Sequence, residues 1–184
     1  HPNYKNHRLR IGEAARGKTK AGVHATNYGV GDRKLAQTLG ITVAEAARFR
    51  AKWFGAHPGI RKWHLRTEES ANKRGYVENR FGARLYNLGR LNLPELLGWL
   101  PQSTVAGVIN RALVNIDAAN LRGETSVELL IQVHDSLAGQ FITEMKDEEI
   151  ANLTRLSQIP IPYEDPLIIP VGINCSTDSW GGAK

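Results

Sequence analysis

The stretch Arg16-Gly-Lys-Thr-Lys20-Ala-Gly-Val-His24-Ala-Thr-Asn-Tyr28-Gly29 places a long polar or aromatic side chain at every fourth position. Successive residues of an α-helix are turned by about 100°, so these four side chains fit within a stripe of about 120°. The spacing therefore predicts a helix with one distinctive face. An ordinary basic surface helix would have the same spacing, so the pattern needs support from the rest of the chain.

The residues around this stretch predict several helices separated by glycine and proline. The first helix is expected from about Gly12 to Asn27, and a capping box formed by Thr42 and Glu45 opens another. Two more helices are expected at residues 32–39, ended by Gly40, and at residues 60–74, preceded by Pro58 and ended by Gly75.

The second half of the chain predicts strands as well as helices. The spacing of apolar residues predicts a long helix from Gln102 to Leu121. Two apolar runs at residues 128–133 and 137–142 flank His134-Asp135-Ser136, which predicts a hairpin with this polar triplet at its tip. A hairpin at 76–86, a helix at 147–157 and a strand through 168–173 complete the expected elements. The expected fold class is α+β, with helices and a small antiparallel sheet.

Charge is distributed unevenly along the chain. Residues 1–90 contain 19 Lys and Arg against 6 Asp and Glu, and residues 91–184 contain 5 against 12, giving a formal net charge of +6. A basic region joined to an acidic one is typical of a protein that binds nucleic acid with one part. A solvated basic surface would give the same counts, so charge alone leaves both interpretations open.

Length and composition exclude several classes of protein. A chain of 184 residues with 41% hydrophobic and 23% charged residues is expected to be globular. No apolar run is long enough to span a membrane and no signal peptide is evident, so we expect a soluble protein of the cytoplasm, or of the host cytoplasm if it is viral. With Cys175 as the single cysteine, neither an internal disulfide nor a zinc-site spacing is expected.

Arg16, Lys20 and Tyr28-Gly29 resemble the fingers helix of family A (polymerase I-like) DNA polymerases, whose pattern is Arg-x3-Lys-x7-Tyr-Gly. The resemblance implies that Arg16 and Lys20 bind the phosphates of the incoming nucleotide, with Lys20 also a general acid to the leaving pyrophosphate. Phosphoryl transfer requires positive charge around the triphosphate. Tyr28 is expected at the template side of the nascent base pair, where it would contact nucleotide and DNA.

His24 departs from the family pattern, which has Phe or Tyr beside the sugar and base of the nucleotide. In the family, Tyr at this position is associated with acceptance of dideoxynucleotides and Phe with their exclusion. Imidazole is flat and can still stack, so we expect His24 to bind the nucleotide with altered sugar selectivity.

The segment Glu128-Leu-Leu-Ile-Gln-Val-His134-Asp135-Ser136 resembles the family's palm motif, a strand that ends in His-Asp-Glu. A carboxylate at a tight turn is held rigidly and faces outward, as a Mg²⁺ ligand requires. The resemblance implies that Asp135 is a catalytic metal ligand and that His134 touches the primer end. Ser136 replaces an auxiliary Glu. An aspartate that only caps its own hairpin is the structural alternative.

Other segments extend the resemblance over nearly the whole chain after about residue 10. Residues 75–84 resemble a fingers hairpin, and residues 101–106 resemble the start of a palm helix. On this helix Gln102 is expected to bind the minor groove of the primer-template. Residues 176–182 are similar to the C-terminus of phage-type members.

The first palm motif of the family, Asp-x-Ser-x-x-Glu-Leu-Arg, is missing from this sequence. Two-metal transfer needs two carboxylates, and the chain supplies one candidate, Asp135. We expect a DNA-directed DNA polymerase fragment, with fingers at 1–92 and half of the palm at 93–184, that is inactive until an upstream polypeptide supplies the missing motif. Its other expected partners are primer-template DNA, deoxynucleoside triphosphates and Mg²⁺, but no membrane.

Two other functions fit part of the sequence. A non-catalytic DNA-binding or assembly module could retain the polymerase fold, although it would not need Lys20 and Asp135. A metal phosphohydrolase also uses a His-Asp doublet, but it carries the doublet on helices with further His and Asp ligands that are not found here.

Overall fold

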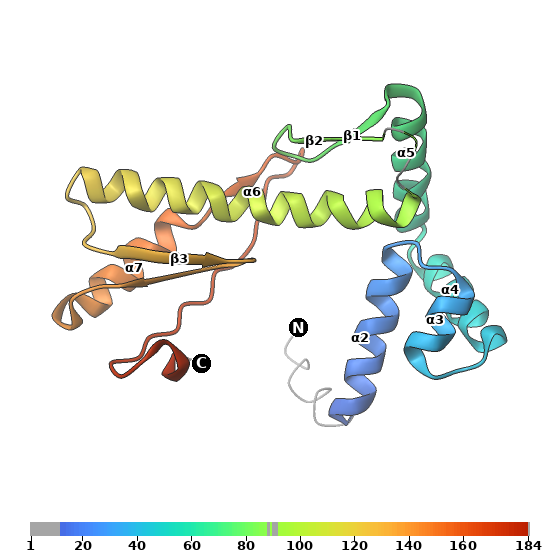
Figure 1. Cartoon of the computed structure of the whole chain (residues 1–184), viewed down its shortest axis with the longest axis horizontal. Helices are drawn as coiled ribbons and strands as arrows, with labels where there is room; N and C mark the ends of the chain where they lie inside the picture. The colour runs from blue at the N-terminus through green and yellow to red at the C-terminus, as the bar shows by residue number, and fades with distance from the viewer. Residues whose placement is uncertain (1–11, 88, 90–91, 184) are drawn as a thin grey trace. The chain divides into compact units, whose positions relative to one another are not determined.

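The computed structural model describes residues 12–87, 89 and 92–183. The chain forms two compact units, each with its own core. The first unit combines residues up to Val77 with Arg84–Trp99, and the second combines Glu78–Ala83 with the residues from Leu100 onward. Helices alternate with three small two-stranded sheets, which confirms the predicted α+β class (Figure 1). Within the described residues, no helix has the length and hydrophobicity that a membrane span requires.

Four helices form most of the first unit: α2 (Glu13–Asn27), α3 (Asp32–Leu39), α4 (Val43–Ala56) and α5 (Pro58–Arg74). The predicted capping box opens α4, because the Glu45 N–H donates to Thr42 Oγ1 and the Glu45 carboxylate accepts from the Thr42 N–H. Helix α5 begins at Pro58, two residues before the predicted start, since the fixed φ of proline suits the first helical position.

The core of the first unit lies between α2, α3 and α4. Its buried members are Leu35, Ala36, Leu39 and Ala46, with Ala25, Val30 and Phe49 packed against them. An ion pair of 2.5 Å between Arg50 and Asp32 also joins α4 to α3. These contacts cover one side of α2 and leave the opposite side open.

The longest helix, α6, extends from Leu93 to Leu121. The prediction that it starts at Gln102 was wrong, and Pro101 lies inside the helix rather than before it. Proline lacks an N–H and normally interrupts a helix. The segment before it is nevertheless helical because it buries Leu96 and Leu97, which are 3% and 0% exposed.

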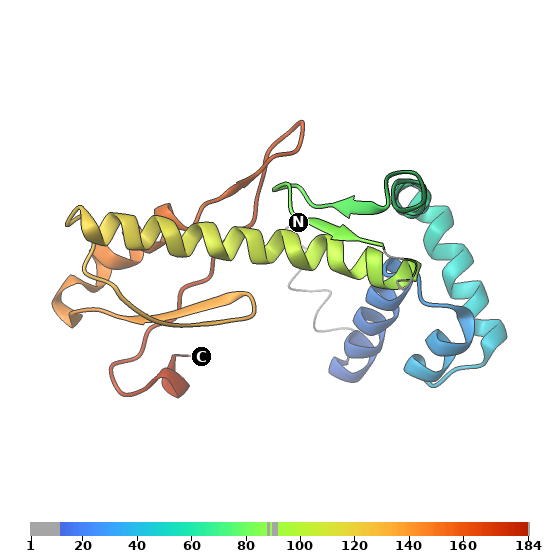
Figure 2. The same ribbon diagram turned by 45° about the horizontal axis from the view of Figure 1, so that its top comes forward.

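In the second unit, α6 runs beside the hairpin of β3 (Glu128–Val133) and β4 (Ser136–Gln140), as Figures 1 and 2 both show. Helix α7 (Lys146–Leu156) follows the short 3₁₀ turn η1 (Thr143–Met145). One core cluster joins α6, the hairpin and α7 through Ile116, Ala119, Val127 and Leu156, with Leu129, Leu137, Phe141 and Leu153 around them. A second cluster contains Val108, Ala112, Ile159 and Ile161, with Phe81 and Leu137 against it.

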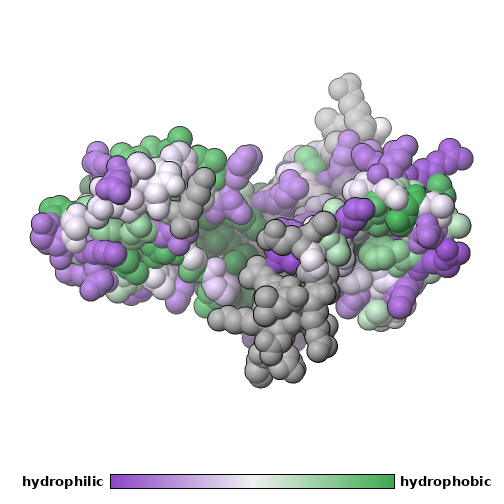
Figure 3. Space-filling view, turned by 90° about the horizontal axis from the view of Figure 1, so that it is seen from below, coloured by the Kyte–Doolittle hydropathy of each residue, from purple (hydrophilic) through white to green (hydrophobic). Residues whose placement is uncertain are grey.

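The β3–β4 register contains a bulge. Leu129 pairs with Gly139, but the next pair is Ile131 with Ala138, so Leu130 is the extra residue. A Cβ at Gly139 would lie 2.8 Å from the carbonyl oxygen of Glu128, so only glycine fits opposite the bulge. Leu130 and Ile131 are 56% and 50% exposed. On the face drawn in Figure 3, apolar surface lies among polar atoms.

Two strand predictions need correction. The expected strand at 168–173 is limited to β6 (Leu167–Ile168), which pairs with β5 (Pro160–Ile161). Ile169 and Val171 are exposed, so apolar β-favouring residues formed no strand where no partner strand was present. Strand β4 begins at Ser136, one residue earlier than predicted. The remaining elements include β1 (Tyr76–Glu78), β2 (Arg84–Tyr86) and the 3₁₀ turn η2 (Trp180–Gly182).

Candidate functional site

The open face of α2 carries the side chains that the sequence singled out. Arg16, Lys20 and His24 are exposed and Tyr28 is half-buried. The His24 and Tyr28 rings meet edge to face, with centroids 5.7 Å apart and an interplanar angle of 75°. Two cations and an aromatic pair therefore share one side of one helix.

The opposite side of α2 is built from small residues. Gly22 and Thr26 are buried. A Cβ added at Gly22 would lie 3.1 Å from Leu39 Cδ1 and 3.4 Å from Phe49 Cζ. Because α2 packs closely on α3 and α4 at Gly22, Lys20 and His24 lie on the free side there, whereas residues 15–20 in the first turns are exposed.

The C-terminal end of α2 is held by side chains from two other helices. The Trp53 indole N–H on α4 donates to Asn27 Oδ1 at 2.8 Å, and His64 Nε2 on α5 lies 2.7 Å from the Asn27 carbonyl oxygen. A carbonyl can only accept, so Nε2 is the protonated ring nitrogen of His64. Burial lowers the pKa of His64, and the hydrogen bond to Asn27 only partly opposes this.

A two-residue turn at the tip of the β3–β4 hairpin contains the candidate metal ligand. Val133 pairs with Ser136, so His134 and Asp135 alone form the turn. His134 has φ of 52°, which is the only positive value among the described non-glycine residues. Ser136 Oγ donates to the Val133 carbonyl at 2.8 Å, and the Asp135 side chain is exposed.

The turn lies alongside α6. Gln132, just before the tip, donates to Asn110 Oδ1 on α6 at 3.2 Å. Gln102 is exposed on the same helix, eight residues earlier, which is about 12 Å along the helix axis. Gln102, His134 and Asp135 thus all belong to the second unit.

The turn between β1 and β2 also packs on α6. Asn79 Nδ2 donates to Ser103 Oγ at 3.1 Å, and Asn79 Oδ1 accepts from the Phe81 and Ala83 N–H groups. The Phe81 ring lies against Gly107, where an added Cβ would approach Phe81 Cδ2 to 2.6 Å. Glycine at this position allows the close contact.

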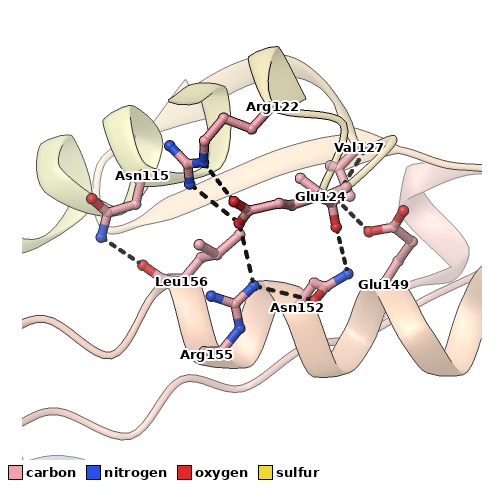
Figure 4. A network of polar contacts seen from close by, with 9 residues as sticks. Asn115, Arg122, Glu124, Val127, Glu149, Asn152, Arg155 and Leu156 are labelled. Carbon is pink, nitrogen blue, oxygen red and sulfur yellow. Dashed lines mark hydrogen bonds and ion pairs between the residues drawn. The ribbon is translucent and has the colours of Figure 1, made fainter. Parts of the chain in front are cut away.

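A buried carboxylate holds the start of β3 against α7. Glu149, which is 0% exposed, accepts from the Thr125 hydroxyl, from the Ser126 N–H at 2.7 Å and from the Ser126 hydroxyl at 2.8 Å. Burial alone would raise the pKa of Glu149, but these hydrogen bonds outweigh it and bring the pKa below its usual range. Figure 4 shows two of the surrounding bonds from asparagine side chains to main-chain carbonyls, Asn115 to Leu156 and Asn152 to Glu124. Asn120 likewise donates to the Val127 carbonyl at 2.7 Å.

Asp135 is the metal ligand that the sequence predicts. Among residues 12–87, 89 and 92–183, no three His, Cys, Asp or Glu side chains cluster closely enough to hold a metal ion. Asp135 supplies one exposed carboxylate of the kind that Mg²⁺ prefers. The donors among the described residues therefore fit Mg²⁺ only together with further ligands.

Comparison with known proteins shows the family to which the chain belongs. The family model for DNA polymerase family A matches residues 4–181. The chain belongs to DNA polymerase family A. This confirms the family to which the fingers and palm motifs pointed.

Relatives in this family are several times longer. The thermostable DNA polymerase I of Thermus thermophilus is 32% identical over 167 residues, which are 85% of this chain and 19% of that protein. DNA polymerase I of Bacillus caldotenax is 29% identical over 167 residues, which are again 85% of this chain and 19% of that protein. A structure of the POL domain of Pol1 from M. smegmatis, in complex with DNA primer-template and dNTP, superimposes with a TM-score of 0.76 at 25% identity and covers 85% of this chain and 29% of that one. The chain thus spans about a fifth of the length of the curated relatives it matches.

Sequence reasoning missed the residues that support the α2 face. Asn27, Trp53 and His64 were not singled out together, because they are separated along the chain by 26 and 37 positions from Asn27. Trp53 lies on the helix that the Thr42–Glu45 capping box opens and was not singled out. Its indole N–H, which needs a partner when buried, was the available signal.

Proposed function

We propose that this chain supplies the fingers and half of the palm of a DNA-directed DNA polymerase, which transfers nucleotides to a primer under the direction of a template. The observation that carries the proposal is the α2 face, where Arg16, Lys20, His24 and Tyr28 follow one another at intervals of about one turn, with the buried Gly22 and Thr26 on the other side of the helix. Membership of DNA polymerase family A supports the same function. Within the proposal, the fingers comprise residues 1–92 and the palm portion residues 93–184.

Arg16 and Lys20 would bind the triphosphate. Their Cα atoms are about 6 Å apart along the helix axis, a separation that allows both cations to reach one polyphosphate. Neither side chain has an ion-pair partner among the described residues, so both can face a ligand. Positive charge at this location would stabilise the leaving pyrophosphate, and Lys20 would donate a proton to it.

His24 and Tyr28 would form the surface beside the sugar and the base of the nucleotide. Their edge-to-face contact leaves a flat imidazole exposed next to a phenol ring. Aromatic faces of this kind stack on bases and sugars. Tyr28 would extend this surface to the template.

Asp135 would bind Mg²⁺ as one member of a two-metal site. The ion, when bound, would neutralise charge on the triphosphate and activate the primer hydroxyl. The chain's own contribution is a carboxylate at a turn whose two ends are paired in β3 and β4. The second carboxylate would come from an upstream polypeptide that carries the first palm motif.

The proposed DNA contacts include residues of the second unit and basic residues of the first half of the chain. His134, beside Asp135 in the turn, would contact the primer end, and Gln102 would contact the minor groove. The structure of the relative from M. smegmatis contains DNA primer-template and dNTP, which supports the proposal that this chain binds both ligands. The +13 charge of residues 1–90 supports binding to a polyanion.

Primer extension tests this proposal. The chain should extend a primer when it is combined with the remaining part of the polymerase domain and Mg²⁺, and it should not do so alone. Activity that is absent from the combination, while the chain still binds primer-template DNA, would favour a non-catalytic DNA-binding or assembly module. Lys20 and Asp135 favour the enzyme, because a binding module would need neither.

A further inference from the structure

We infer that Asn27, Trp53 and His64 form a latch that positions the nucleotide-binding face of α2, and that they are positioning residues for nucleotide insertion. The inference rests on the proposed function of that face. We call these three residues the Asn27 latch. It links the end of α2 to α4 through Trp53 and to α5 through His64, by the two hydrogen bonds of 2.8 Å and 2.7 Å.

The latch completes the hydrogen bonding at the end of α2. The last four carbonyl groups of a helix lack partners within it. In α2 the carbonyls of His24, Ala25 and Thr26 accept from the main-chain N–H groups of the three residues that follow the helix, Tyr28, Gly29 and Val30. The remaining carbonyl, that of Asn27, accepts from His64. A side chain on another helix thus satisfies the final carbonyl next to Tyr28.

His64 is itself held firmly. It is 3% exposed, and its ring lies edge to face with Phe54 at 5.6 Å and is tilted against Trp63 at 5.4 Å. Gly29 follows with φ of +74°, where an added Cβ would lie 3.0 Å from Leu97 Cδ1. A rigid donor on one side and a crowded glycine on the other fix the direction of the chain at Tyr28.

Other contacts of α2 are less directional. Gly22 and Ala25 present little surface, and the buried Thr26 Oγ1 has no hydrogen-bond partner among the described residues. Among the side chains that the structure describes, Asn27 and its two partners provide the hydrogen bonds between α2 and other helices. Small residues alone would let α2 rotate about its axis. Asn27, three residues after His24 and directly before Tyr28, is placed to prevent this.

Misplacement of a binding face by about 1 Å can cost on the order of 100-fold in rate. Loss of one of the two latch bonds should be milder, so we expect kcat/KM for the incoming nucleotide to fall by about tenfold. Affinity for primer-template DNA should stay within about twofold, because the latch does not form the proposed DNA contacts.

The test combines four variants with two measurements. His64→Phe keeps a ring but removes the donor, whereas His64→Gln retains a donor at about the position of Nε2. Trp53→Phe removes the indole N–H. Trp63→Phe is the matched control, since it keeps an aromatic ring beside His64 and removes an indole N–H that has no hydrogen-bond partner among the described residues. The first measurement is amide hydrogen exchange at Tyr28, Gly29 and Val30 in the chain itself. The second is single-nucleotide insertion by the complete polymerase, with the unfolding midpoint of each variant recorded.

The positioning proposal predicts faster exchange and reduced nucleotide kcat/KM in His64→Phe and Trp53→Phe, with recovery in His64→Gln and no effect of Trp63→Phe. Unchanged exchange in both loss variants would overturn the latch, whatever the polymerase does. Faster exchange with unchanged insertion kinetics would overturn the positioning role and leave the proposed function intact. A wild-type combination that inserts no nucleotide would overturn the proposed function and the positioning role together, and exchange would then report a purely structural contact.

Discussion

Val133 and Ser136 face each other directly across the β3–β4 hairpin, so the turn between them consists of His134 and Asp135 alone. A turn of two residues leaves little conformational freedom for the main chain at Asp135. The Ser136 hydroxyl bond to the Val133 carbonyl closes the base of the turn. The same geometry places His134 in the left-handed region of backbone space, with φ of 52°.

Two replacements of His134 should differ in stability but should slow primer extension alike. His134→Gly removes the cost of a positive φ and should raise the free energy of unfolding relative to His134→Ala by about 1 kcal/mol. Both variants lose the proposed contact with the primer end, so both should extend a primer more slowly. Chemical denaturation of the chain and primer extension by the complete polymerase provide the two measurements. Equal stability of the two variants would show that the turn is not strained.

Arg16→Ala and Lys20→Ala should impair nucleotide use and spare DNA binding. Each variant should raise the nucleotide KM or lower kcat by at least about tenfold, because charge stabilisation of a triphosphate is lost. Primer-template affinity should change little. Lys18→Ala is the matched control, since Lys18 is exposed on the same helix but is turned about 160° from Arg16 and Lys20. Parallel loss of duplex affinity in both variants would indicate a general basic face instead.

His24 should set selectivity between deoxynucleotides and dideoxynucleotides. The imidazole edge is polar, so His24→Phe should raise discrimination against dideoxynucleotides and His24→Tyr should lower it. The free-energy difference between insertion of the two substrates should change by the value of one hydrogen bond, about 0.5 to 1.5 kcal/mol. Competition between the two substrates in single-nucleotide insertion measures it. The same ratio for all three residues would place His24 away from the sugar.

Glu149 should make the second unit sensitive to acid. Its pKa is lowered in the folded chain, so its contribution to stability is fully present above the unfolded pKa of about 4.3 and is lost as the pH falls through the folded pKa. Glu149→Gln should cost about 2 kcal/mol at pH 7, because an amide cannot accept all the hydrogen bonds that Thr125 and Ser126 donate. Chemical denaturation of the wild type and of Glu149→Gln between pH 3 and 7 measures the difference in their free energies of unfolding. This difference should become smaller as the pH falls. A difference that stays constant over this range would contradict the assignment.

Local signals in the sequence predicted much of the fold. The Thr42–Glu45 capping box, the end of α3 at Gly40 and the hairpin around His134 and Asp135 all depend on residues close together in the chain, and each was confirmed. The start of α6 and the length of β6 depend instead on tertiary contacts. Burial of Leu97 overrode the helix-breaking tendency of Pro101, and none of the described strands pairs with the residues beyond Ile168.

In the candidate site, too, the features that depend on tertiary contacts were not predicted from the sequence. Spacing along a single helix was enough to align Arg16, Lys20 and His24, and the structure shows all three exposed on α2. The Asn27 latch joins three helices and has no short-range pattern. Sequence therefore indicated the side chains that would face a ligand but not those that hold the helix in position.

Single-nucleotide insertion by the complete polymerase with Asp135→Asn tests the central claim most directly. Loss of the carboxylate charge should remove several kcal/mol of stabilisation from the reaction and slow insertion on the order of 1,000-fold, while primer-template affinity and the unfolding midpoint stay close to wild type. Asp117→Asn, an exposed aspartate on α6, is the matched control and should insert normally. Insertion by Asp135→Asn at the rate of the Asp117→Asn control would contradict the assignment of Asp135 as a catalytic metal ligand and, with it, this chain's role in nucleotide transfer.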